Sequence, residues 1–129
     1  MSNKKIAIFT GGTGGHVIPS INFGNYLINL GYNCVIFLDS RGLKYASEFQ
    51  GNIIIIKSAH FSGNFFFKIT SLFQLIIGFM QSLFYLFIFK PEHCISFGSY
   101  ASFMPLLAAN ILKFLGLTKI HLHEQNSIY

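Results

Sequence analysis

Four glycines and a histidine stand within six residues near the start of the chain, at residues 11–16 (GGTGGH). Glycines let a backbone turn sharply and approach a ligand closely. An apolar run at residues 6–9 precedes them, and Pro19 suits the first turn of a helix after them. Amides at a helix N-terminus favour phosphate oxygens or a developing negative charge, and an imidazole can change protonation near neutral pH. The run therefore predicts an anion-binding turn that carries a titratable group.

This run matches neither common nucleotide-binding fingerprint. In the pattern G-x-G-x-x-G the last glycine falls on Val17, and the phosphate-loop pattern fails because no Lys-Ser or Lys-Thr follows. A glycine-rich turn after a strand can also be only a tight connection. His16 can act as a general base or an anion partner, or it can cap the helix; its place directly after the glycines favours a functional role.

Two later polar segments also follow apolar runs, at residues 98–100 (GSY) and 123–126 (HEQN). Glu124 is one of only four acidic residues, and it can either orient a histidine or bind a hydroxyl, or cap the next helix. Tyr100 can stack on a ligand or pack in the core, and its place after two small residues favours the ligand. Both segments are candidates for the same site as the glycine run.

Two weaker chemical signals concern a metal and a ribose. His121 and His123 alternate on one strand face, but no third ligand at a suitable spacing is visible, so we expect no metal site. Asp39 ends a strand-like run, where an acidic residue can hold a ribose. Such a residue is more often a cap or a turn residue, which is the role we expect for Asp39.

Hydrophobic periodicity divides the chain into alternating strands and helices. Strands are predicted at residues 6–9, 33–38, 53–56, 93–97 and 119–123, and helices at 19–30, 43–49, 65–89 and 101–115. The alternation predicts one α/β domain over residues 1–129, with a Rossmann-like, doubly wound parallel sheet. Ligands of such sheets bind beyond the carboxyl ends of the strands, so the three polar turns should converge at one edge.

The predicted helix at residues 65–89 has two interpretations. Residues 69–89 carry no charge, and as a helix they would rise about 31 Å, near the apolar thickness of a bilayer. Small and polar side chains nevertheless recur every three or four positions: Thr70, Ser71, Gln74, Gly78, Gln81, Ser82 and Tyr85. That stripe favours a helix packed on the sheet over a transmembrane span, with part of its outer face against a membrane. Lys68 and Lys90 flank the segment and can meet anionic headgroups.

Composition narrows the class of partner. Apolar residues make up 52% of the chain and charged residues 10%, which excludes intrinsic disorder. The net charge of +5 favours anionic partners, but the lysines are scattered, so we expect no nucleic-acid partner. Cys34 and Cys94 each fall inside a predicted strand and read as two buried, reduced thiols of a cytoplasmic protein. The N-terminus lacks the apolar region and cleavage site of a secretory signal.

Residues 11–16, 98–100 and 123–126, with their spacing, resemble the N-terminal half of the MurG-type family of UDP-N-acetylglucosamine transferases, over essentially the whole chain. The resemblance implies one half of a two-domain GT-B fold. It also implies transfer of N-acetylglucosamine from UDP-N-acetylglucosamine to the C4 hydroxyl of the muramic acid sugar of lipid I. The product is lipid II for peptidoglycan synthesis, the reaction inverts the sugar configuration, and neither a cofactor nor a metal is strictly required.

The resemblance implies roles for individual residues, each assigned by its match to a position in the family motifs. Four positions match family contacts to the donor: Thr13, Gly14, Gly15 and Asn126. His16 matches the catalytic base, Glu124 a second polar residue of the catalytic cleft, and Tyr100 lies in the turn expected near the acceptor. Ser99 stands where the family usually has glycine, which can narrow access for the acceptor.

The resemblance also implies partners. They are UDP-N-acetylglucosamine, lipid I, the cytoplasmic face of the inner membrane as a peripheral contact, and a C-terminal domain that these 129 residues do not include. That domain supplies most donor contacts in the family, so we expect little activity from this chain alone. An alternative is a noncatalytic subunit that recruits a split UDP-N-acetylglucosamine transferase to the membrane.

Overall fold

The computed structural model describes residues 4–12, 14–58, 65–98 and 102–122 of the chain, and of residues 65–67 only the backbone. The strands are β1 (Lys5–Phe9), β2 (Asn33–Leu38), β3 (Asn52–Ile55), β4 (His93–Ser96) and β5 (Lys119–Leu122). The helices are α1 (Gly14–Asn29), α2 (Phe65–Phe89) and α3 (Phe103–Phe114), with one short 3₁₀ helix, η1 (Leu43–Tyr45). The predicted alternation of strands and helices is confirmed, with most boundaries shifted by one or two residues.

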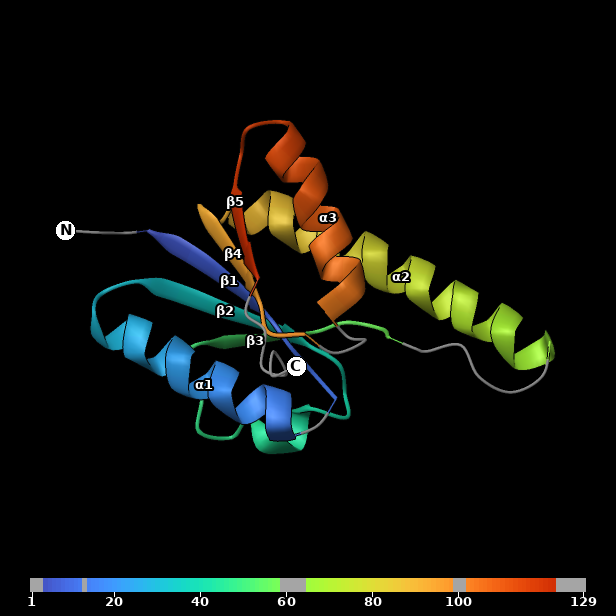
Figure 1. Cartoon of the computed structure of the whole chain (residues 1–129), viewed down its shortest axis with the longest axis horizontal. Coiled ribbons are helices and arrows are strands. Elements are labelled where there is room, and N and C mark those ends of the chain that lie inside the picture. The colour runs from blue at the N-terminus through green and yellow to red at the C-terminus, as the bar shows by residue number, and fades with distance from the viewer. Residues whose placement is uncertain (1–3, 13, 59–64, 99–101, 123–129) are drawn as a thin grey trace, which may run out of the picture.

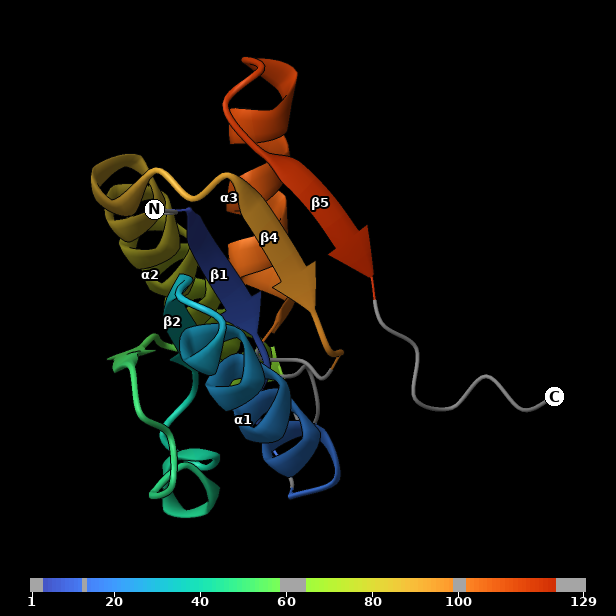
Figure 2. The ribbon, with the colours of Figure 1, turned by 90° about the vertical axis from the view of Figure 1, so that its left-hand side faces the viewer.

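The five strands form one sheet in the order β3-β2-β1-β4-β5, and every neighbouring pair is parallel. Helix α1 covers one face, and α2 and α3 lie on the other (Figures 1 and 2). The chain moves outward from β1 in one direction and then returns to its other side at β4. This arrangement is the predicted Rossmann-like, doubly wound sheet, with its switch point between β1 and β4.

Each central strand buries both of its faces, which explains the nearly continuous apolar runs in the sequence. In β1, Ile6 and Ile8 enter the core beneath α1, whereas Ala7 and Phe9 enter the core beneath α2 and α3. The two free cysteines follow the same alternation: Cys34 lies in the first core and Cys94 in the second, both buried as predicted.

The start of α1 corrects the sequence prediction. The helix begins at Gly14, five residues before Pro19, so Pro19 lies inside it. A proline there removes only one backbone hydrogen bond, the one that its missing N–H would donate to Gly15. In the next residue, the hydroxyl of Ser20 donates to the carbonyl of His16 at 2.7 Å. His16 therefore lies in the first turn of the helix and not in the loop before it.

The segment after β2 also differs from the prediction, because the helix expected at residues 43–49 is only the three-residue η1. Beyond η1 the backbone makes one further turn bond, from the amide of Phe49 to the carbonyl of Ala46 at 3.1 Å. Asn25 of α1 donates from Nδ2 to the carbonyl of Glu48 at 2.9 Å and accepts at Oδ1 from the amide of Gln50 at 2.8 Å. These two bonds tie the segment to α1, and the helix does not continue.

Helix α2 packs inward through only part of its predicted stripe of small and polar residues, since Thr70 and Tyr85 of that stripe are exposed. The backbone of Gly78 lies directly over the carbonyl of Lys57, and Gln81 Oε1 accepts from the Lys57 amide at 2.8 Å. Ser82 is fully buried and donates to the Gly78 carbonyl at 2.7 Å. By length and composition the stretch Lys68–Phe89 is also apolar enough to cross a membrane, with 22% of its most apolar window buried inside the protein.

Candidate active site at the carboxyl edge of the sheet

The turn after β1 is fixed by a buried carboxylate from the neighbouring strand. Gly11 and Gly12 have positive φ angles of 153° and 81°, which a side chain would strain. Asp39 Oδ1 accepts from the amide of Gly12 at 3.0 Å and from that of Gly42 at 3.2 Å, while Oδ2 accepts from Arg41 Nε at 3.0 Å. Asp39 is therefore a turn residue, as expected. It also occupies the Gly12 amide, which the sequence analysis expected to face a ligand.

His16 lies against the turn that follows β4. Its Nδ1 is 3.1 Å from the carbonyl oxygen of Phe97, and its ring lies over the backbone of Gly98. A carbonyl can only accept a hydrogen bond, so in the neutral imidazole Nδ1 carries the proton and Nε2 keeps its lone pair. This tautomer is the one that a general base acting through Nε2 requires.

Gly98 lets the turn beside this imidazole adopt a left-handed backbone conformation. Its φ is +92°, which a side chain would strain, whereas a Cβ atom there would make only an ordinary contact of 3.4 Å with His16 Cε1. The Gly98 carbonyl accepts a hydrogen bond from the hydroxyl of Ser102, a buried residue at the start of α3. The turn that positions His16 is therefore held from its far side by the next helix.

The structure thus brings together two of the three polar turns that the sequence placed at one edge. Gly14, Gly15 and His16 form the first turn of α1. The other four predicted residues of the site lie outside the described residues: Thr13, Tyr100, Glu124 and Asn126. Ser99 lies outside them too. Within the described ranges, no three histidine, cysteine or acidic residues are grouped so that they could hold a metal ion.

Sequence reasoning missed the residues that orient the imidazole. Phe97 contributes only a backbone carbonyl, and Ser102 acts on His16 through Gly98. Neither role leaves a signal in side-chain type, because any residue at position 97 would offer the same carbonyl. The one sign in the sequence was Gly98 itself, because a glycine shortly after a strand often marks a turn with a positive φ, as it does here.

The sheet order and the glycine turn at its switch point define a Rossmann-like domain whose ligand edge lies at the carboxyl ends of β1 and β4. Solved glycosyltransferases share this fold. MurG of Acinetobacter baumannii superposes with a TM-score of 0.80 at 22% identity, over 98% of this chain and 36% of that one. The model of the glycosyltransferase family 28 N-terminal domain matches residues 6–129, and the chain belongs to that family.

Curated relatives carry one enzyme name, UDP-N-acetylglucosamine–N-acetylmuramyl-(pentapeptide) pyrophosphoryl-undecaprenol N-acetylglucosamine transferase. The relative from Wolbachia pipientis (strain wPip) is 40% identical over 123 residues, which are 95% of this chain and 32% of the relative. That from Protochlamydia amoebophila is 37% identical over 130 residues, covering 98% of this chain and 34% of the relative. The chain therefore spans about a third of the length of these relatives.

Proposed function

We propose that this chain forms the acceptor-side half of an inverting transferase that moves N-acetylglucosamine from UDP-N-acetylglucosamine to the C4 hydroxyl of lipid I. The product would be lipid II for peptidoglycan synthesis. The names of the curated relatives support this substrate pair. The observation that carries the proposal is the His16 imidazole, held at the carboxyl edge with its Nε2 lone pair available.

In the proposed reaction, His16 Nε2 takes the proton of the acceptor hydroxyl as its oxygen attacks the anomeric carbon. The bond to UDP breaks on the opposite face of the sugar, which inverts the configuration. The hydrogen bond from Nδ1 to Phe97 fixes the ring and favours the imidazolium that forms. The first turn of α1, at Gly14 and Gly15, supplies amides and the positive end of a helix dipole for diphosphate charge. The remaining roles stay as proposed from the sequence. Thr13 and Asn126 contact the donor, Glu124 is a polar residue of the catalytic cleft, and Tyr100 lies near the acceptor.

We also propose that the domain works at the cytoplasmic face of the membrane, where lipid I is held. Helix α2 supports this placement because its outer face is apolar and exposed. The exposed residues recur at helical spacing: Ile69, Phe73, Ile76, Ile77, Met80, Phe84, Phe87 and Ile88. A helix that lies in the membrane surface shows such a face. The same face would serve the alternative function, a noncatalytic subunit that recruits a separate donor-binding chain to the membrane.

Reconstitution separates these two functions. The chain would be combined with the C-terminal two thirds of the Wolbachia relative, and transfer of labelled N-acetylglucosamine to lipid I would be measured. We expect His16→Ala to lower the rate about 10² to 10⁴-fold, the usual contribution of a general base. The matched control on the exposed face of α1, Asn22→Ala, should keep the full rate. A reconstituted enzyme indifferent to His16→Ala would exclude this residue as the base and favour the recruiting role.

A further inference from the structure

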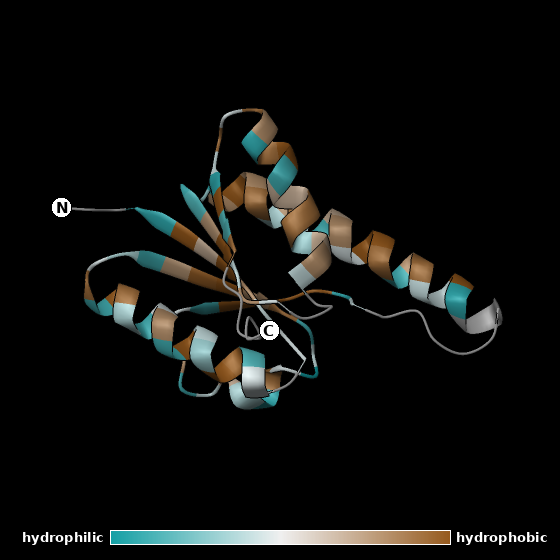
Figure 3. Ribbon diagram, in the orientation of Figure 1, coloured by the Kyte–Doolittle hydropathy of each residue, from teal (hydrophilic) through white to brown (hydrophobic). Residues whose placement is uncertain are grey.

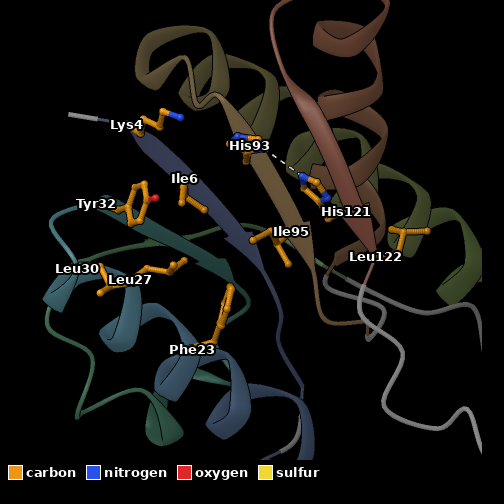
Figure 4. Close-up of a pocket in the computed structure, with 10 residues that line it drawn as sticks. All are labelled: Lys4, Ile6, Phe23, Leu27, Leu30, Tyr32, His93, Ile95, His121 and Leu122. Atoms are coloured by element: carbon orange, nitrogen blue, oxygen red, sulfur yellow. Dashed lines mark hydrogen bonds between the residues drawn. The ribbon is translucent and has the colours of Figure 1, made fainter. Parts of the chain in front are cut away.

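Two histidines meet across the neighbouring strands β4 and β5, before the carboxyl edge of the sheet where His16 lies. His93 opens β4, and His121 is the third residue of β5. The register pairs Ile95 with His121, so the two histidines lie on the same face of the sheet, diagonally across neighbouring strands. Figure 4 shows their rings turned toward one another, with His93 Nδ1 only 3.1 Å from His121 Nε2.

This distance is that of a hydrogen bond between the two rings, and it also matches two imidazoles that share one metal ion. With metal–nitrogen bonds of about 2.0–2.1 Å, two ligands lie about 2.9 Å apart at a right angle and about 3.3 Å apart at the tetrahedral angle. The observed 3.1 Å falls between these values. An ion could therefore replace the shared hydrogen bond once the rings rotate so that both lone pairs point to it. We propose that His93 and His121 form a binding site for a transition-metal ion of the zinc, nickel or copper type.

The charges around the pair limit which ions it can take. Lys4 and Lys119 repel cations, and Glu92 opposes them only in part. Imidazole nitrogens bind borderline and soft ions well, whereas magnesium and calcium require oxygen ligands.

The site would have a structural effect, since β5 pairs within the described residues only with β4. A metal held by His93 and His121 would join this outer strand to its neighbour. The pair stands at one end of an open, largely apolar pocket of about 490 Å³ between α1 and the strands, which leaves room for water on the remaining coordination positions (Figure 4). Because neither histidine has a role in the proposed reaction, this proposal does not depend on the proposed function.

Nickel titration tests the site in the untagged chain. We expect nickel and zinc, but not magnesium, to bind and to raise the melting temperature by linkage. His93→Gln and His121→Gln should each weaken nickel binding at least tenfold in calorimetry. The matched control His16→Gln, which removes the histidine at the carboxyl edge of the sheet, should bind as the unchanged chain does.

A second measurement needs no variant. In imidazole nitrogen–proton spectra of the unchanged chain, paramagnetic nickel should broaden the resonances of His93 and His121 before those of the other histidines. Broadening that begins at other histidines, or affinity that survives both substitutions, would overturn the proposal.

Discussion

The two helical layers are alike where they meet the sheet and different where they face outward. Helix α1 buries Val17 and Ile21 against one core, and α2 buries Leu75 and Leu86 on the other side. Outward, α1 carries asparagines at helical spacing, whereas α2 exposes a nearly continuous row of Phe, Ile, Leu and Met (Figure 3). Since both helices are already packed, the outer apolar face of α2 is not needed for folding. This difference supports the proposal that α2 faces an apolar surface while α1 faces water.

The largest effect should come from making the outer face of α2 polar. Phe73 and Phe84 are 63% and 61% exposed, so Phe73→Ser with Phe84→Ser should leave folding nearly unchanged. Each phenylalanine buried in a membrane surface contributes about 1.5–3 kcal/mol. We therefore expect the double variant to bind anionic vesicles at least 100-fold more weakly, as measured by co-sedimentation.

Tyr26 gives the matched control, because it is 60% exposed on α1. Tyr26→Ser should leave vesicle binding unchanged. If the two variants lost binding equally, the layers would not differ in what they face.

The inner contacts of the two helices can be compared through one glycine in each. A methyl group on Gly78 of α2 would overlap the carbonyl oxygen of Lys57, a backbone atom that cannot move alone. On Gly24 of α1 it would meet Phe49 Cε1 at 2.7 Å, and that ring can turn aside. We expect Gly78→Ala to lower the free energy of unfolding by about 2 kcal/mol or more. Gly24→Ala should stay within about 1 kcal/mol, because alanine favours the helix.

Urea unfolding with a common slope measures both values. Equal losses at the two glycines would show that α2 can shift on the sheet as readily as α1. In that case the polar stripe of α2 would not fix its position over β3.

The sequence predicted those features that depend on a repeating pattern or on residues close together in the chain. The strand–helix alternation determined the sheet, and the stripe containing Gly78 and Gln81 placed α2 against it. The run of glycines before His16 located the ligand edge, because few other roles need so many residues without side chains at one turn. The predicted start of α1 was wrong because it placed Pro19 in the first turn, where proline is usual, whereas the helix contains this proline in its second turn at the loss of one backbone hydrogen bond.

Contacts between distant residues were not predictable in the same way. Asp39 binds the amide of Gly12 from 27 positions away, and local pattern shows only that an aspartate ends a strand. The pairing of His93 with His121 depends on the register of β4 against β5, which a single sequence does not specify. Sequence analysis instead compared His121 with His123, its neighbour on the same strand. Such contacts need the sheet order and register, and these came only with the structure.

The smallest expected effect is the loss of folding stability at high pH that the two buried thiols cause. Cys34 lies in the core beneath α1, and Cys94 lies in the core beneath α2 and α3. Burial raises the pKa of Cys34 and of Cys94 to about 11, although a hydrogen bond between Cys94 and Thr118 opposes the shift at Cys94. Between pH 9 and 11 the unfolded chain loses these protons while the folded chain keeps them, so folding stability must fall as the pH rises. We expect a loss of about 1–2 kcal/mol for each thiol, seen in urea unfolding at pH 8 and pH 11.

Alanine variants assign this loss to one layer or the other. Cys34→Ala and Cys94→Ala should each remove about half of the thiol contribution, and the double variant should keep only the alkaline loss of its tyrosines and lysines. Equal contributions from the two thiols would mean that both cores exclude water equally and that the helical layers differ only on their outer surfaces. A contribution from Cys34 alone would place water behind α2, and the comparison between the layers would then have to include their interiors.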